Sequence, residues 1–206
     1  MLHHNPGRTL LGLGSRNATS PPFHGVGLGV NDKVFFGIQP PANTATSIAR
    51  LTRDVREKHG LVGKPVLPRC LHISLLFVGY FGRLSQDMLS AFGEAAATIR
   101  MPPFRIALDR VLSFRHPQQR PLVLSGDEGV TGLVWLRDKL VAATTHIRGT
   151  VGARNFTPHL TLLRDGQEVR EEPVAAISWT ATEFILIRSV YGEGRHIPLA
   201  RWTLRG

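Results

Sequence analysis

The sequence predicts an α+β fold with antiparallel strand pairing. Short runs of aliphatic and aromatic residues, typical of strands, are interleaved with three longer segments. In those longer segments apolar residues recur at three- and four-residue steps, as on one face of a helix. A chain of 206 residues that is 42% hydrophobic is also long enough for a domain with a substantial core. Strands interleaved with helices in this way indicate an α+β domain.

The first half of the chain predicts two strands and two helices. The run KVFFGIQ at 33–39 fits a strand that ends at Pro40 and Pro41, because proline cannot donate to a sheet ladder. The run CLHISLLFV at 70–78 fits the second strand. The two helices are residues 43–58, with the stripe Ile48, Leu51 and Val55, and residues 84–100, with the stripe Leu84, Met88, Phe92, Ala95 and Ile99. Phe35 and Phe36 point to opposite faces of the first strand, and packing against helices is favoured over stacking on a base.

The second half predicts strands at 104–112 and 121–125, a helix at 130–147, a strand at 159–164, one long strand at 174–190 and a last strand at 196–204. Trp135, Trp179 and Trp202 fall in these periodic segments and are expected in the core.

The N-terminal segment differs in composition from the rest. Residues 1–31 are rich in glycine, proline, serine and asparagine, and no acidic residue precedes Asp32. This composition predicts a flexible tail at 1–31 followed by a single folded domain at 32–206. Arginine with serine and no acid also fits an organelle transit peptide, but glycine and proline disfavour the amphipathic helix that such a peptide needs.

Charge and cysteine content indicate which partners and which cellular compartment suit the protein. The formal net charge is +10, and lysine supplies only Lys33, Lys58, Lys64 and Lys139 of the 25 basic residues. Arginine suits phosphate, so a polyanion such as RNA is a plausible partner, while arginines scattered over a solvated surface are equally plausible. No stretch approaches the roughly 18 apolar residues of a membrane span, which predicts a soluble protein. The single cysteine, Cys70, predicts a reducing compartment, the cytoplasm, and is interpreted as a packed thiol rather than a nucleophile.

Two short stretches nearly repeat each other, LHISLLFVG at Leu71–Gly79 and PHLTLLRDG at Pro158–Gly166. Side chains alternate faces along a strand, so His72 and Ser74 share one face, as do His159 and Thr161. Each strand therefore combines a core face with a face that carries an imidazole and a hydroxyl roughly 7 Å apart. If the two strands lie in similar lobes that face one cleft, the four side chains converge on one site.

Two imidazoles and two hydroxyls suit the opening of a cyclic phosphodiester. One histidine near its usual pKa removes a proton from the attacking oxygen and the other protonates the leaving oxygen. The hydroxyls donate to the non-bridging phosphoryl oxygens. A strained cyclic diester does not demand a metal, so no metal or other cofactor is expected.

Other interpretations of these histidines stay open at this point. A single histidine before serine or threonine is usually structural, with its ring bonded to a backbone carbonyl. A metal pair is disfavoured because neither strand carries a further ligand, and Asp165 comes closest. Of the remaining histidines, His59 and His146 are placed near helix C-termini and His196 near a strand start. Arg115 and Arg120 flank the loop that contains His116 and are a weak signal for an RNA-end contact.

The doubled motif resembles the 2H phosphoesterase superfamily, above all its bacterial and archaeal RNA 2′,3′-cyclic phosphodiesterases, often called 2′-5′ RNA ligases. Flanking segments are similar too: VFFGIQPP at 34–41 to the first strand, FTPHLTLLR at 156–164 to the second motif, and ILIRSV at 185–190 with LARWTL at 199–204 to the closing strands. Together they span residues 33–204.

The resemblance implies a bilobal α+β fold with two pseudo-twofold lobes whose antiparallel sheets flank a central active-site groove. It implies that His159 activates water and that His72 protonates the departing 3′ oxygen, which leaves a 2′-phosphate. Ser74, Thr161 and Arg164 would bind the phosphate, and the reverse reaction would join RNA ends 2′-5′. RNA ends or cyclic nucleotides are then the substrates, and a monomer is expected. The first motif has Ser74 where threonine is usual, which keeps the hydroxyl donor. A non-catalytic module that binds nucleotides or RNA ends in the same groove is the alternative.

Overall fold

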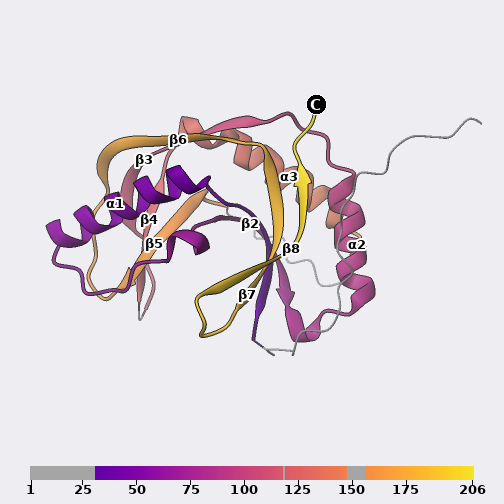
Figure 1. Ribbon diagram of the computed structural model, residues 1–206, viewed down its shortest axis with the longest axis horizontal. Helices are drawn as coiled ribbons and strands as arrows, with labels where there is room; N and C mark the ends of the chain where they lie inside the picture. The colour runs from indigo at the N-terminus through magenta and orange to yellow at the C-terminus, as the bar shows by residue number, and fades with distance from the viewer. Residues whose placement is uncertain (1–30, 118, 148–155) are drawn as a thin grey trace, which may run out of the picture.

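The chain folds around one antiparallel sheet in the computed structural model, which describes residues 31–117, 119–147 and 156–206 (Figure 1). Within these residues the sheet has eight strands. From edge to edge they are β6 (Glu172–Ala181), β3 (Phe104–Ser113), β4 (Arg120–Ser125), β5 (His159–Asp165), β2 (Ile73–Tyr80), β1 (Lys33–Ile38), β7 (Glu183–Val190) and β8 (Arg195–Thr203). The α-helices are α1 (Ala42–Lys58), α2 (Gln86–Ala97) and α3 (Thr131–Thr144), and the short 3-10 helices are η1 (Pro68–Cys70), η2 (Phe81–Arg83) and η3 (Glu128–Val130). The α+β class expected from the sequence is confirmed. The tail expected at 1–31 falls, except for its last residue, outside the described residues.

The sheet consists of two four-stranded halves that meet at the two motif strands. Strands β6, β3, β4 and β5 form one half, and β2, β1, β7 and β8 form the other. Long ladders hold each half together, whereas β2 and β5 pair only where Ile73 lies opposite Leu160. Both residues come directly after a motif histidine. The fold therefore places the two motifs at the centre of the sheet, on adjacent strands.

Alternation along the motif strands follows the pattern that the sequence predicts. Ile73 and Leu160 are fully buried on the core face, whereas Ser74 is exposed and Thr161 half-buried on the opposite face. The core face is covered by helices: α1 packs against β5 and β6, and α3 against β2 and β3. Ser74 and Thr161 therefore lie outside the core that these helices cover.

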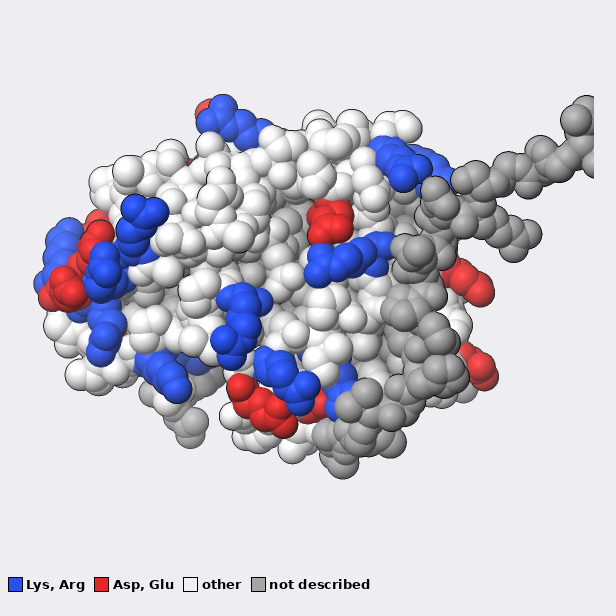
Figure 2. All heavy atoms as spheres, in the orientation of Figure 1, with Lys and Arg blue, Asp and Glu red and all other residues white. Residues whose placement is uncertain are grey.

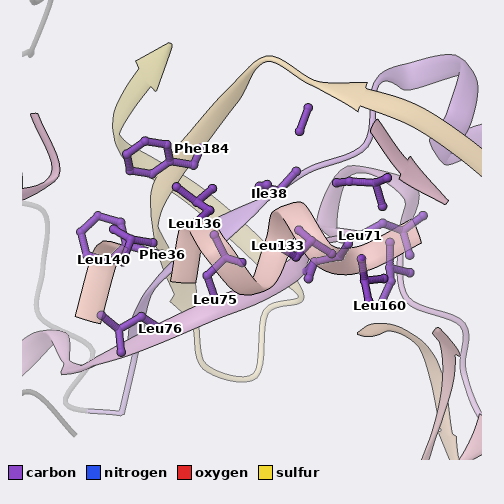
Figure 3. Packing of buried hydrophobic residues seen from close by; sticks show 14 of the residues in the cluster. Phe36, Ile38, Leu71, Leu75, Leu76, Leu133, Leu136, Leu140, Leu160 and Phe184 are labelled. Carbon is purple, nitrogen blue, oxygen red and sulfur yellow. The ribbon is translucent and has the colours of Figure 1, made fainter. Parts of the chain in front are cut away.

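One continuous apolar core joins the two halves. Leu133, Leu136 and Leu140 of α3 are fully buried and belong to the same cluster as Phe36 of β1 and Leu75 of β2 (Figure 3). Burial of a leucine-sized side chain stabilises the fold by about 1.5–3 kcal/mol. Because the core under β2 and the core under β5 belong to one cluster, the two motif strands are fixed relative to each other.

A buried ion pair anchors the start of β1 to the end of β7. Both Asp32 and Arg188 are almost inaccessible, and the guanidinium donates to Asp32 Oδ2 from Nε and Nη2, each at 2.6 Å. Asp32 Oδ1 accepts the backbone N–H of Tyr191 at 2.9 Å. Burial alone raises the pKa of the Asp32 carboxyl, but the bonds from Tyr191 and Arg188 outweigh it and hold that pKa below its usual value.

The prediction of one long strand at 174–190 is wrong. The segment forms two strands, β6 and β7, separated at Thr182, and they lie in different halves of the sheet (Figure 1). The Thr182 carbonyl accepts the N–H of Leu204 just beyond β8. No glycine or proline marks the break, so only the pairing partners of the two strands reveal it.

The expectation that Trp135 lies in the core is also wrong. Its side chain is 61% exposed, whereas Trp179 is buried and Trp202 is half-buried against Phe184 with ring centroids 5.3 Å apart. Helix α3 turns Leu133 and Leu136 toward the sheet, and a residue two positions after Leu133 lies about 200° around the helix. A tryptophan in a segment with helical apolar periodicity is therefore not necessarily buried.

Candidate active site

The junction of β2 and β5 brings the two motifs together. With Ile73 opposite Leu160, the antiparallel register directs His72 toward the position across from Thr161, and Ser74 toward the position across from His159. This register places each motif histidine on the same face as the hydroxyl residue of the other motif. Gly37 of β1 pairs with Ser74, and a Cβ on Gly37 would lie 2.8 Å from the Ile73 carbonyl oxygen. Glycine is therefore required beside the first motif.

The two histidines are held in the same way. His72 Nδ1 lies 2.8 Å from the carbonyl oxygen of Cys70, and His159 Nδ1 lies 2.7 Å from that of Thr157. A carbonyl only accepts, so Nδ1 of each ring carries the hydrogen, and Nε2 of each neutral ring is the unprotonated nitrogen. The shared two-residue spacing presents two equivalent Nε2 atoms for proton transfer.

A phenylalanine packs against each ring. The centroids of Phe35 and His72 are 4.7 Å apart, and those of Phe114 and His159 are 4.8 Å apart. Phe36 packs in the helix-covered core as expected. Phe35 instead lies in a separate buried cluster with Ile185 and Ile187, against the imidazole. The expectation that both phenylalanines pack against helices therefore fails for Phe35.

Both imidazoles favour the neutral state. Burial lowers the pKa of His72 most, the bond to Cys70 opposes this, and the charge of His159 lowers the pKa further. Burial likewise lowers the pKa of His159, opposed by the bond to Thr157, and the nearby charge of Arg164 adds to the lowering. The two histidines therefore interact electrostatically, and Arg164 lies close enough to act on His159.

The predicted phosphate-binding residues carry free polar groups. Ser74 and Arg164 are exposed and Thr161 is half-buried. Within the part of the chain that the structure describes, the Arg164 side chain makes no hydrogen bond or ion pair. On the face drawn in Figure 2, Lys and Arg lie spread over the surface, several of them beside Asp or Glu. The basic residues on this face are therefore dispersed rather than gathered in one dense patch.

A third histidine, for which no sequence motif predicts a role, lies against His72. His196 is at the start of β8, and its ring centroid is 4.8 Å from that of His72 and 5.9 Å from that of Phe35. Burial and the charge of His72 lower the pKa of His196 to about 4. No local pattern marks this residue, because only the β7–β8 pairing brings it to the site.

The structure also places the remaining candidates from the sequence. His59 follows the C-terminus of α1, as predicted, and its Nε2 lies 3.0 Å from Glu172 Oε1. Arg115, His116 and Arg120 line a pocket of about 430 Å³ together with Pro117 and Glu168. Cys70 is buried, as expected for a packed thiol.

Asp165, the closest candidate for a metal ligand, has a structural role. Its carboxylate accepts the backbone N–H groups of Gln167, Gly63 and Val62 at 2.9, 2.6 and 2.8 Å, and these bonds lower its pKa. No group of three or more His, Cys, Asp or Glu side chains suited to a metal ion occurs within the described ranges. None of the helices described is long and apolar enough to cross a membrane.

Two half-sheets that present a paired histidine–hydroxyl motif at their junction define a phosphoesterase of the two-histidine class. The family profile of the 2′-5′ RNA ligase superfamily matches residues 40–192, and the chain belongs to this family. The RNA 2′,3′-cyclic phosphodiesterase of Escherichia coli is 32% identical over 178 residues, which is 84% of this chain and 96% of that protein. The enzyme of the same description from Thermus thermophilus is 27% identical over 184 residues, 84% of this chain and 91% of its own length.

A solved structure shares the fold. The crystal structure of E. coli LigT complexed with 3′-AMP superposes with a TM-score of 0.71 at 30% identity, over 85% of this chain and 99% of that chain. The bilobal 2H phosphoesterase-like fold that the resemblance implied is thereby confirmed.

Proposed function

We propose that this protein is an RNA 2′,3′-cyclic phosphodiesterase in which His72 and His159 form the acid–base pair. The observation that carries the proposal is the matched geometry of the two rings. Each Nδ1 is bonded to the carbonyl of the residue two positions earlier, and each Nε2 is left to exchange a proton. Binding alone does not require a base and an acid, and the relatives are named for this catalytic activity. Nothing in the site or among the relatives favours the alternative of a non-catalytic binding module.

In the proposed reaction, Nε2 of His159 accepts a proton from a water molecule, whose oxygen attacks the phosphorus atom. The bond from phosphorus to the ribose 3′ oxygen breaks, and the protonated Nε2 of His72 donates its proton to that oxygen. The products are a 2′-phosphate and a 3′-hydroxyl. Ser74, Thr161 and Arg164 hold the non-bridging oxygens, whose negative charge increases in the transition state.

The neighbouring charges support this division of roles. Burial lowers the pKa of His159 most, and the charge of Arg164 lowers it further, so this ring favours the neutral state that a base needs. Burial lowers the pKa of His72 as well, but the negative charge of a bound phosphate raises it and so favours the protonated ring that an acid needs. In the reverse reaction, the same groups would join a cyclic phosphate end to a 5′-hydroxyl. Hydrolysis is the net direction in water.

The proposal extends to the substrates, the cellular compartment and the oligomeric state. RNA ends and cyclic nucleotides both fit the chemistry of the site as substrates. The single cysteine still predicts a reducing compartment such as the cytoplasm, and a monomer is expected.

The reaction product tests the proposal directly. Incubation with an oligoribonucleotide that ends in a 2′,3′-cyclic phosphate, in the presence of EDTA, is expected to yield only the 2′-phosphate end. Mass spectrometry with a phosphatase specific for one isomer distinguishes the 2′-phosphate from the 3′-phosphate. A 3′-phosphate product would reverse the roles of the ribose oxygens, and loss of activity in EDTA would show that a metal is required.

The pH dependence of kcat/KM is expected to be bell-shaped, with its maximum on the acid side of the ordinary imidazole pKa of about 6.5. One ring must be neutral and the other protonated, and the pKa values of both rings are lowered in the free protein. The two apparent pKa values belong to the pair rather than to either residue. Initial rates on a 2′,3′-cyclic nucleotide across the pH range check this expectation, and a maximum well above pH 7 would contradict it.

A further inference from the structure

Three rings from three strands meet beside the first motif. Phe35 of β1 and His196 of β8 both contact His72, which directly precedes β2. The His72 and His196 rings meet edge to face, with an interplanar angle of 72°. Phe35 lies against His72 at a shallower angle of 31°. The imidazole of His72 is therefore enclosed by two rings, one apolar and one titratable.

The β7–β8 hairpin is fixed so that His196 stays in this position. His196 pairs with Ser189 across the hairpin, and the N–H of Tyr191 in its turn donates to the buried Asp32. Cys70 Sγ donates to the Gly194 carbonyl at 3.0 Å, and the Cys70 carbonyl accepts from His72. Gly194 has φ +56°, a conformation that favours glycine. One residue, Cys70, thus connects the hairpin turn to the ring of His72.

His196 is an uncharged neighbour of His72 near neutral pH. Its Nδ1 is buried and has no hydrogen-bond partner among the described residues. Its pKa, lowered to about 4, lies far below physiological pH. Two imidazolium ions at this ring separation would repel each other strongly in a partly buried site. The pair of rings therefore carries at most one proton near neutral pH.

We propose that His196 is a positioning residue for the reaction: its neutral ring covers His72, excludes water from it and fixes the direction of Nε2. This inference rests on the proposed function, in which Nε2 of His72 protonates the leaving oxygen. The other titratable groups on the neighbouring elements are His159 across the β2–β5 junction, Arg195 and Glu193, which form an ion pair in the hairpin, and Lys33, which lies opposite Ser189 in the β1–β7 register. A change confined to His196 leaves all of them in place.

Two substitutions separate the contribution of the ring from that of its nitrogens. His196→Ala removes the cover, so water reaches His72, and the pKa of His72 is expected to rise toward about 6.5. In the same variant, kcat on a 2′,3′-cyclic nucleotide is expected to fall about tenfold, because Nε2 of His72 is no longer held toward the leaving oxygen. His196→Phe keeps the cover and is expected to retain both the rate and the His72 pKa of the wild type. His146→Ala, at an exposed histidine just after α3, is the matched control and should change neither.

Side-chain NMR of the full chain gives the decisive measurement. The ring signals of His72, His159 and His196 are followed against pH in the wild type and in the three variants. A rise in the His72 pKa in His196→Ala, with His159 unmoved and His196→Phe like the wild type, supports the inference. Unchanged values in His196→Ala, or a His196→Phe that shifts as far as His196→Ala, overturn it. Because the titration needs no turnover, it stands even if the protein fails to hydrolyse cyclic phosphates.

The wild-type titration alone also tests the inference, in case His196→Ala does not fold. His196 is expected to stay neutral well below pH 6. A ring that titrates at the ordinary imidazole value would show that His196 is solvated, and would end the proposal.

Discussion

Substitution of either motif histidine, His72→Ala or His159→Ala, is expected to lower kcat on a 2′,3′-cyclic nucleotide by about 10²–10⁴-fold. This is the usual contribution of one positioned acid or base. In each case the equivalent Nε2 of the other motif remains but cannot perform both proton transfers in one step. The fold should survive, since both rings are only partly buried and, among the described residues, each hydrogen-bonds to a carbonyl two positions earlier in the chain. Initial rates measured at several pH values, with circular dichroism as the check on folding, provide the test.

The double variant sharpens this expectation. If the two histidines act as a pair, His72→Ala combined with His159→Ala should cost little more than either single change. His146→Ala again controls for the loss of an exposed histidine. Turnover that persists unchanged in the double variant would falsify the two-histidine mechanism.

Replacement of Asp32 by alanine is expected to destabilise the fold by about 3–5 kcal/mol, because it leaves the guanidinium of Arg188 buried without its carboxylate. It also removes the acceptor for Tyr191 N–H in the β7–β8 hairpin. Urea unfolding of the wild type and of Asp32→Ala at neutral pH measures the difference in the free energy of unfolding. The exposed pair of Glu193 with Arg195 supplies the control, and Glu193→Gln should have little effect.

The stability that is lost in Asp32→Ala is expected to depend on pH. The folded-state pKa of Asp32 lies below its unfolded value of about 3.9, so the stabilisation is present above that value and is lost as the pH falls through the folded pKa. The difference in the free energy of unfolding between wild type and Asp32→Ala should therefore become smaller in acid. A double change to apolar residues, Asp32→Leu with Arg188→Met, should cost less than Asp32→Ala. An equal loss in the double variant would assign the effect to packing rather than to the uncompensated charge.

The elements that the sequence predicted well are those with a strong local period. The motif strands alternate between a buried residue and a site-facing residue, so Ile73 and Ser74 were assigned to opposite faces from their spacing alone. Helix α1 was predicted to within one residue for the same reason. The break between β6 and β7 and the exposure of Trp135 were missed. Neither depends on local period: the first depends on pairing with distant strands, and the second on which face of α3 meets the sheet.

The sequence by itself determined which residues are candidates for proton transfer and phosphate binding, because histidine and hydroxyl side chains two residues apart on a strand are a local pattern. It determined His72, Ser74, His159 and Thr161 as candidates and the family to which they point. Only the tertiary structure decided what surrounds them: the β2–β5 junction, the phenylalanine behind each imidazole, and His196 against His72. These contacts join residues far apart in the chain. Their geometry depends on strand order and register, which the long-range packing of the core selects.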